Sequence, residues 1–457
     1  MAYTNVQFIG YVIDTAPQVN PDGSQTYLGL SDPSLDISAR CDLMQRAMQT
    51  AYSALQPQSP PAPQSPPSDL GDTLTVFMAP EFFFRGAQGA YQMDDVQLAV
   101  TTLQAMAASD QWQDWVFVFG SIVGVSSPTF NTPPYDIDPL ATKEVYNFAP
   151  VQQGGIAAQG DTGARIVMKE LMSGVDFIAA AANPGGLLLG DVEHMPASAS
   201  GMGREQQQVN YDGAGVFSLA GITWGLEVCL DHSDAVRRLQ KSPQLPGDNL
   251  IQLQVVPSCG MSIQAQSVIT QDGGYVFNCD GSGVASHSTL AQQIPPLINI
   301  VMASSTPVSD AAIGAQSVSV SALYASGPGV VNIYPAQPIP LPQSVDGHTT
   351  TLTWPASPDY TFIFQLIYNT SGNFVTVLCE IRSKRVNFYG NNYFLPLLLQ
   401  TQDAAKQDVR IQMSLAAGSS PYAGAVWCKI SVPGFIFEGN AFEFSATFGG
   451  LPPFTVW

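Results

Sequence analysis

The feature that most constrains the fold is an alternation of strand-like and helix-like patterns over the first 124 residues. Continuous apolar runs, which are typical of buried strands, lie at 5–13, 73–80 and 114–124. Amphipathic stretches with helical spacing separate them at 35–55 and 94–107. A strand–helix–strand order requires crossover connections, so we expect the three strands to be parallel neighbours. The pattern therefore predicts an α/β fold.

A change in composition divides the chain. Residues 336–346 are rich in proline, and 347–457 alternate aromatic and β-branched residues with Gly, Ser and Asn breaks. Such alternation is typical of a small β-sandwich. We therefore predict a first domain over 1–335, a linker over 336–346 and a smaller all-β, sandwich-like domain of unknown role over 347–457.

Charge, hydropathy and cysteine spacing exclude several classes of protein. The net charge is -20, and an acidic surface of this kind repels phosphate groups, so we expect no nucleic acid and no membrane as partners. No apolar run reaches the about 18 residues of a membrane helix, and the N-terminus has no basic segment before an apolar one. These features predict a cytoplasmic protein. The six cysteines include no CxxC pair and indicate no disulfide framework.

A hairpin and a short helix are expected in the second half of the first domain. Residues 215–231 contain two apolar stretches that meet at Ala220 and Gly221. Residues 233–241 have helical spacing, and Ser233 is the expected N-cap.

Cys229 ends the second apolar stretch, within the sequence GLEVCLDH. A cysteine in a buried strand is more often structural than reactive. Here, however, a helix is expected to begin within four residues, and the free N–H groups of such a turn, Leu230's among them, favour a thiolate and can hold an oxyanion. His232 lies on the same turn and is a candidate base, although a histidine that only lines the turn is the more common arrangement.

Two charged residues also follow apolar strands. Glu81 comes after TLTVFMAP and before three phenylalanines, whose surroundings would raise its pKa as a general base requires. The alternative is a solvated glutamate at a strand end. Lys169 follows the apolar IVM, and a cation beside Cys229 would stabilise an anionic intermediate. Its alternative is a surface ion pair with Glu170.

Glu81, Lys169 and Cys229 together resemble the Glu–Lys–Cys triad of the carbon–nitrogen hydrolase, or nitrilase, superfamily. The matching stretches are VFMAPEFFFRG, IVMKE and GITWGLEVCLDH, which occur in the family's order, and FVFGSIVG, VYNFAPV and LQVVPSCGM resemble further landmarks. The resemblance covers about residues 5–335. It implies a four-layer αββα sandwich that acts without a cofactor or a metal and assembles as a homodimer or higher homo-oligomer.

The resemblance also implies a reaction on a small-molecule substrate. Glu81 would take the thiol proton of Cys229, and the thiolate would attack an amide. Lys169 and the N–H of Leu230 would stabilise the negative charge, and water would then hydrolyse the thioester. The alternatives are acyl transfer or amide formation from the same thioester, hydrolysis of a nitrile, and a catalytically silent binding protein. Leu230 and Asp231 after the cysteine resemble amidase-like branches more than nitrilases, which commonly have Trp-Glu there.

The remaining candidates are polar residues near the triad. Asp231 is expected to orient the turn. Glu227 lies two residues before the cysteine, on the same strand face, where it either meets the substrate or forms a buried ion pair. Many members of the superfamily have a second glutamate between the lysine and the cysteine, and the candidates here are Asp176 and Glu193.

Aromatic residues offer a candidate acyl pocket. Phe82, Phe83, Phe84 and Tyr146 are placed by sequence near the triad. They either line the pocket or belong to the core. The acyl group of the substrate does not follow from them.

Overall fold

The structure is a computed structural model, and the chain divides into two units. Unit 1 comprises Met1–Leu239 and Ile251–Leu341, and unit 2 comprises Gln240–Leu250 and Pro342–Trp457. The division after Leu341 falls inside the stretch that the sequence assigns to a linker. The structure describes residues 3–22, 25–56, 72–129, 142–156, 163–171, 192–194, 215–236, 249–283, 286–294, 297–300, 306–308, 318–344, 346–353, 360–368, 374–383, 393–400, 408–414, 425–431, 443–448 and 454–455, and the single positions 133, 138, 173, 175, 176, 238, 239 and 313.

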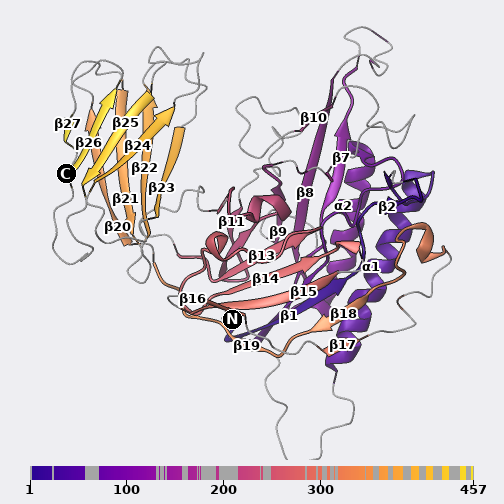
Figure 1. Ribbon diagram of the computed structural model, residues 1–457. Coiled ribbons are helices and arrows are strands. Elements are labelled where there is room, and N and C mark those ends of the chain that lie inside the picture. The colour runs from indigo at the N-terminus through magenta and orange to yellow at the C-terminus, as the bar shows by residue number, and fades with distance from the viewer. Residues whose placement is uncertain are drawn as a thin grey trace, which may run out of the picture. The chain divides into compact units, whose positions relative to one another are not determined.

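Three parallel strands form the centre of the larger sheet of unit 1 (Figure 1). Strand β1 (Asn5–Val12) pairs in parallel with β4 (Thr73–Met78), and β4 pairs in parallel with β6 (Trp115–Val118). The connections contain α1 (Pro33–Leu55) and α2 (Met93–Ala107). The predicted α/β arrangement is therefore confirmed for this part of the chain.

Antiparallel strands extend this centre into an 11-stranded sheet in the order β17-β18-β1-β4-β6-β8-β7-β5, with β9 and β10 paired to β8 and β19 paired to β1. Its other strands are β5 (Tyr91–Gln92), β7 (Ile122–Ser126), β8 (Lys143–Gln153), β9 (Ala164–Met168), β10 (Val192–His194), β17 (Thr306–Val308), β18 (Val330–Ile333) and β19 (Gln337–Pro338). Strands β2 (Gln18–Val19) and β3 (Gln25–Thr26) form a separate ribbon.

The second sheet of unit 1 has six strands, in sequence order from β11 to β16. They are β11 (Val216–Leu219), β12 (Ile222–Leu226), β13 (Leu253–Ser258), β14 (Tyr275–Asp280), β15 (His287–Ile294) and β16 (Leu297–Ile300). The expected hairpin is present as β11 and β12. Its two turn residues, Ala220 and Gly221, have φ values of 54° and 75°, which a tight two-residue hairpin turn requires.

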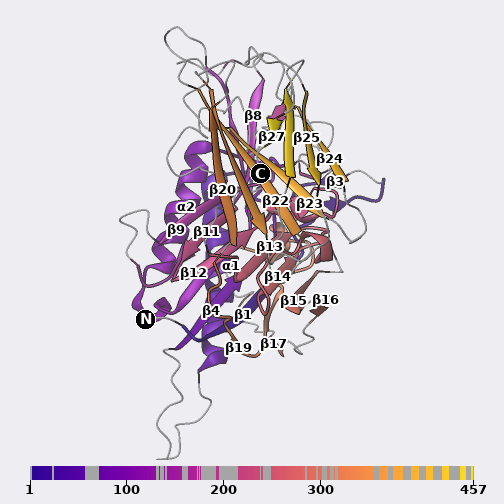
Figure 2. The same cartoon turned by 90° about the vertical axis from the view of Figure 1, so that its left-hand side faces the viewer.

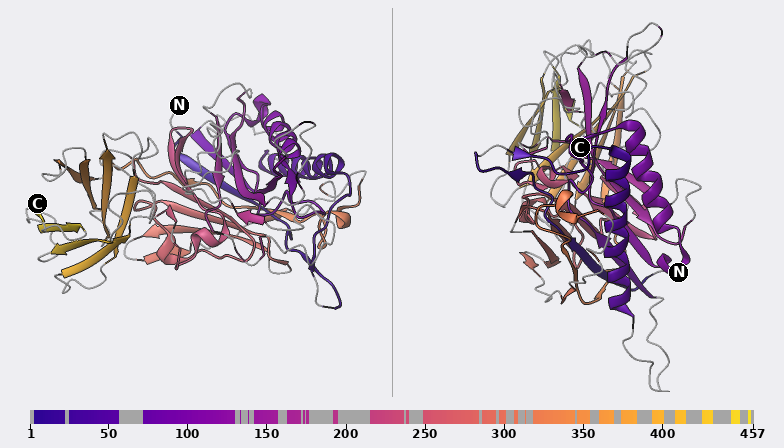
Figure 3. Two further views of the ribbon diagram at one scale, coloured as in Figure 1. Left: turned by 90° about the horizontal axis from the view of Figure 1, so that it is seen from above. Right: turned by 90° about the vertical axis from the view of Figure 1, so that its right-hand side faces the viewer.

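The two sheets pack face to face, and the two helices cover the other face of the larger one. In β1, Phe8 belongs to the core between the sheets, whereas Ile9 and Tyr11 belong to the core under the helices. The ring of Phe8 lies 5.1 Å from that of Phe277 in β14. Strands β14 and β15 lie next to β1 (Figures 1 and 2), and α1 and α2 lie side by side (Figure 3).

The expected four-layer sandwich would have helices on the outer face of the second sheet. Val256, Val268 and Val276 form a small cluster there. In the described part of unit 1, no α-helix covers this face, so the described layers are helix, sheet and sheet. The predicted helix at 233–241 is wrong for its described residues, which form turns.

The backbone N–H groups of this segment explain the difference. The N–H of Arg238 donates to the carbonyl of Asp231, and the N–H of Leu239 donates to the side chain of Glu227. These long-range acceptors replace the carbonyls four residues earlier that an α-helix would use.

Unit 2 contains two four-stranded antiparallel sheets in its described residues. Side chains of this unit lie outside the described part, so the sandwich packing stays a prediction. The first sheet contains β20 (Asp346–Thr353), β21 (Tyr360–Tyr368), β22 (Phe374–Ser383) and β23 (Tyr393–Gln400), and the second contains β24 (Asp408–Ser414), β25 (Ala425–Ser431), β26 (Glu443–Phe448) and β27 (Phe454–Thr455).

Neither of the two helices in the described ranges is long and apolar enough to cross a membrane.

Candidate active site

Glu81, Lys169 and Cys229 lie together at the ends of three strands. Glu81 follows β4 and Lys169 follows β9 in the larger sheet, whereas Cys229 follows β12 in the second sheet. The exposed fractions of the side chains are 0%, 0% and 4%. Lys169 Nζ lies 2.9 Å from Glu81 Oε1, and the charges of both residues act on the thiol of Cys229. The structure therefore brings together three residues that are far apart in sequence.

Two residues of this site have a left-handed backbone. Cys229, the first residue of the 3-10 helix η4 (Cys229–His232), has φ 50°, and Phe82 has φ 62°. This conformation costs a residue with a side chain roughly 1–2 kcal/mol and is found preferentially at functional sites. At Phe82 it is held by a 2.9 Å hydrogen bond from the backbone N–H to Ser121 Oγ.

The two carboxylate oxygens of Glu81 have different surroundings. Oε1 accepts hydrogen bonds from Asn147 Nδ2 and Lys169 Nζ, both at 2.9 Å. Oε2 is buried and accepts no N–H or O–H hydrogen bond from the described residues, whereas the thiol of Cys229 interacts with this carboxylate as a hydrogen-bond donor. Burial raises the pKa of Glu81, and the charge of Lys169 is the main effect that opposes this rise. A carboxylate with a raised pKa and a free oxygen is suited to accept a proton.

Lys169 is a buried ammonium held by two carboxylates. Besides Glu81, it binds Asp176 Oδ1 at 2.6 Å and Oδ2 at 2.7 Å. Burial lowers the pKa of Lys169, but the charges of Glu81, Cys229 and Asp176 outweigh this effect and raise it above its usual value. Asp176 is thus the predicted second carboxylate that the structure places in the site. The side chain of Glu193, the other candidate, lies outside the described part.

Cys229 is a thiol in the resting site. Burial raises its pKa well above the usual value, and the negative charge of Glu81 raises it further. The expectation that the turn favours a thiolate is therefore wrong, because burial and the charge of Glu81 both disfavour ionisation. The sulfur lies 3.8 Å from the carbonyl oxygen of Cys259. Ionisation of Cys229 consequently needs a base, and Glu81 is beside it.

Asp231 joins the cysteine turn to the lysine segment. Its buried carboxylate accepts hydrogen bonds from the backbone N–H groups of Glu170 at 2.7 Å and Leu171 at 2.9 Å. Burial raises the pKa of Asp231 to about 7, against the opposing effect of Arg238. This is an orienting position, as the sequence suggests. Leu230, the second residue of η4, is half-buried.

His232 is not placed to serve as the base. Its Nε2 accepts a hydrogen bond from the backbone N–H of Gln264, so its proton is on Nδ1, which lies 2.6 Å from Glu227 Oε2. The ring therefore donates to a carboxylate and is fixed in one tautomer. Its role is to hold the turn.

Glu227 faces away from the thiol, so the expectation that it shares a strand face with Cys229 is wrong. Its other partners are the backbone N–H of Leu239 at 2.8 Å and Gln254 Nε2 at 2.9 Å. The alternation of strand faces stops at Cys229 because the left-handed φ of that residue turns the chain. Glu227 is therefore a buried carboxylate held by hydrogen bonds, including one from the ring of His232, and the ion pair of the alternative is replaced by a neutral donor.

The four aromatic candidates separate into two groups. The ring of Phe82 lies 5.8 Å from Lys169 Nζ and therefore borders the site. Phe83, Phe84 and Tyr146 belong to the core between the larger sheet and the helices. For these three the alternative that they belong to the core describes their positions: Phe83 and Phe84 lie in the loop after β4, and Tyr146 lies in β8.

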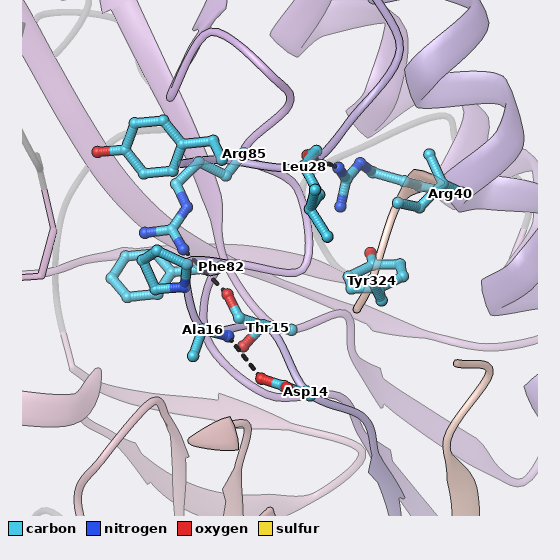
Figure 4. A pocket seen from close by; sticks show the side chains of 11 residues that line it. Asp14, Thr15, Ala16, Leu28, Arg40, Phe82, Arg85 and Tyr324 are labelled. Atoms are coloured by element: carbon cyan, nitrogen blue, oxygen red, sulfur yellow. Dashed lines mark hydrogen bonds between the residues drawn. The ribbon is translucent and has the colours of Figure 1, made fainter. Parts of the chain in front are cut away.

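A small cavity is lined by Phe82, Arg85, Thr15 and Tyr324, among others (Figure 4). Its volume is about 20 Å³, which is enough for a water molecule. Arg85 stacks on the ring of Phe82 with its Cζ 4.1 Å from the centroid, and it donates hydrogen bonds to the carbonyls of Thr15 and Val175. The buried guanidinium supports the loop that follows Glu81.

Sequence reasoning missed Asn147 and Arg85. Asn147 is a polar residue within the apolar strand β8, and Arg85 follows three phenylalanines. A buried polar residue in an apolar strand requires a partner, so each position carried a signal. In the described ranges, no group of three or more His, Cys, Asp or Glu residues is arranged to hold a metal ion.

Comparison of this chain with protein-family models, with curated proteins and with solved structures finds no match.

Proposed function

We propose that this protein is a cysteine-dependent hydrolase of a non-peptide C–N bond, with an amide as substrate. The observation that carries the proposal is the position of Glu81: one oxygen is held by Lys169 and Asn147, the other accepts no N–H or O–H bond from the described residues, and the thiol of Cys229 donates to the carboxylate. This arrangement agrees with the resemblance to the nitrilase superfamily, and membership of that superfamily with a four-layer sandwich is part of the proposal.

The first half of the reaction forms a thioester. Cys229 Sγ bonds to the amide carbon while its proton moves to Glu81 Oε2, and the carbonyl oxygen becomes an oxyanion. Lys169 and the N–H of Leu230 stabilise this charge. The C–N bond then breaks, and the leaving nitrogen takes the proton back from Glu81, so that ammonia or an amine departs.

The second half regenerates the enzyme. Glu81 takes a proton from water, whose oxygen bonds to the thioester carbon. The C–S bond breaks, the acid is released and the proton returns to Cys229. Glu81 is thus base and acid in turn, and a raised pKa suits both steps because it makes the carboxylate a stronger base than an ordinary glutamate.

The charges of the site explain why Lys169 is buried. If Glu81 and Asp176 are both ionised, a single ammonium lies between two carboxylates. Proton transfer from Cys229 to Glu81 exchanges a carboxylate for a thiolate and leaves this balance unchanged. A buried cation can then stabilise the oxyanion without a compensating movement of water.

Acyl transfer to an amine from the same thioester is the second candidate, because the thioester is common to both reactions. Cytoplasmic location, a homo-oligomeric assembly and a β-sandwich in unit 2 are further parts of the proposal.

The test is release of ammonia from a panel of small primary amides, with nitriles in parallel. Cys229→Ala should abolish release. Cys279→Ala is the matched control, because Cys279 is also buried near the inter-sheet core but lies outside the site. The proposal fails if Cys229→Ala remains as active as the wild type. An added amine that yields a new amide would indicate transfer.

A further inference from the structure

Two oxygen atoms in the site are buried acceptors without a hydrogen-bond partner among the described residues. One is Glu81 Oε2 and the other is Asn147 Oδ1. Their residues are in direct contact, since Asn147 Nδ2 donates to Glu81 Oε1. Both side chains have an exposed fraction of 0%. Buried acceptors are normally satisfied, and the single hydrogen of the Cys229 thiol can occupy only one acceptor position of Glu81, so this pair points to a ligand that donates.

The strand directs Asn147 toward the nucleophile. Its neighbours Tyr146 and Phe148 belong to the core under the helices, whereas Ala149, two residues on, belongs to the core between the sheets. Asn147 therefore projects between the sheets, where Cys229 also lies. The backbone carbonyl of Asn147 accepts a 2.8 Å hydrogen bond from the backbone N–H of Lys169, which fixes this part of β8 to the segment that carries the lysine.

The orientation of the Asn147 amide follows from its partner. Its NH₂ group is directed at an oxygen of Glu81, so the carbonyl Oδ1 is the atom left free. A ligand that satisfies both oxygens must donate two hydrogens. The NH₂ group of a primary carboxamide does so, whereas a nitrile nitrogen and an ester oxygen have no hydrogen to donate.

We propose that Asn147 is a specificity-determining residue, which with Glu81 binds the two N–H hydrogens of a primary carboxamide substrate. This inference rests on the proposed function and adds the substrate class. Esters and nitriles would leave both buried acceptors unsatisfied, and such losses are the strongest source of discrimination between similar substrates. Water, with two hydrogens of its own, fits the same place after ammonia has left and is activated there.

The experiment compares two substrates with one acyl group. Asn147→Leu and the wild type are assayed on butanamide and benzamide and on the methyl esters of the same acids. Loss of the Nδ2 bond to Glu81 affects both substrates alike. Loss of Oδ1 affects only the amide. We expect kcat/KM to fall at least about tenfold more for the amide than for the ester, a factor that corresponds to 1.4 kcal/mol.

Asn278→Leu is the matched control. Asn278 is also buried in a strand and also has a free Oδ1 among the described residues, but its Nδ2 binds Val256, Ser258 and Met261. It should leave the amide-to-ester ratio unchanged. The ratio of kcat/KM reports the step up to thioester formation, so a common second step does not affect it.

Equal losses on amide and ester in Asn147→Leu would overturn the inference and leave the proposed function standing. Absence of any turnover by the wild type would overturn both. If Asn147→Leu does not fold, the wild type alone decides: a primary amide should then have the higher kcat/KM, although esters are acylated more readily in solution. A faster ester would contradict the inference.

Discussion

The carboxylate of Asp231, two residues after Cys229, accepts a 2.7 Å hydrogen bond from the backbone N–H of Glu170, the residue after Lys169. A bond to Leu171 completes the link. The carboxylate of Asp231 thus links the turn that carries Cys229, in one sheet, to the segment that carries Lys169, in the other. This geometry depends on the protonation of Asp231, because a protonated carboxyl has fewer acceptor sites for the two N–H groups.

Asp231 should make stability depend on pH. Burial raises the pKa of Asp231 to about 7, above the value of an unfolded aspartate near 3.9. The stability that the raised pKa represents is fully present below about pH 4 and is lost as the pH rises to about 7. Relative to Asp231→Asn, the wild type should therefore lose up to about 1.4 kcal/mol of unfolding free energy per pH unit in this interval. Urea denaturation at several pH values measures the difference, and parallel curves for the two proteins would contradict it.

Removal of Lys169 should destabilise the fold because two buried carboxylates lose their cation. Lys169→Met is expected to cost about 3–5 kcal/mol of unfolding free energy, as for other broken buried ion pairs. Asp176→Asn added to this variant removes one of the two negative charges and should recover part of the loss. Chemical denaturation of the single and double variants checks both expectations. No recovery in the double variant would mean that Asp176 and Glu81 do not share the charge of Lys169.

Glu81 should set the acid limb of the pH–rate profile. Only its ionised form can take the thiol proton, and burial raises its pKa above that of an ordinary glutamate. Activity should therefore decline as the pH falls through this raised value, while Glu81→Gln should reduce kcat/KM by about 10²–10⁴. Initial rates of ammonia release between pH 4 and 9 give the profile. If Glu81→Gln has the kcat/KM of the wild type, another residue must be the base.

Substitution of His232 should reduce stability without a large effect on the reaction. Its ring links Glu227 to the backbone of Gln264, and it has no bond to the thiol. His232→Gln should lower the free energy of unfolding by about 1–3 kcal/mol, the cost of a broken buried hydrogen bond. Its kcat/KM at a temperature where it is folded should stay within a few-fold of the wild type. Complete inactivity of the folded variant would contradict this and indicate that His232 is the general base.

The parallel strands of the larger sheet could be predicted because their pattern is local. Buried parallel strands are apolar throughout, and the intervening helices show their period directly. The site is different. Asp176 pairs with Lys169 through a segment that has no regular pattern, and the left-handed φ of Cys229 ends the strand alternation, so that the thiol and Glu227 lie on different sides. Neither effect has a signal in the spacing of residues.

The missing helix at 233–241 shows the same limit. Helical spacing is present in its sequence, but the N–H groups of Arg238 and Leu239 bond to Asp231 and Glu227, which tertiary packing brings close. Tertiary contacts therefore override a short amphipathic pattern. Asn147 was predictable in part, since a buried amide in an apolar strand requires a partner; that the partner is Glu81 required the fold.

The most direct measurement is the intact mass of the protein after rapid mixing with a primary amide that it hydrolyses. We expect a transient species heavier by the acyl group, which peptide mapping assigns to Cys229 and which is absent from Cys229→Ala. Turnover with no such species under conditions that slow hydrolysis of the thioester, or an acyl group on another residue, would contradict the account.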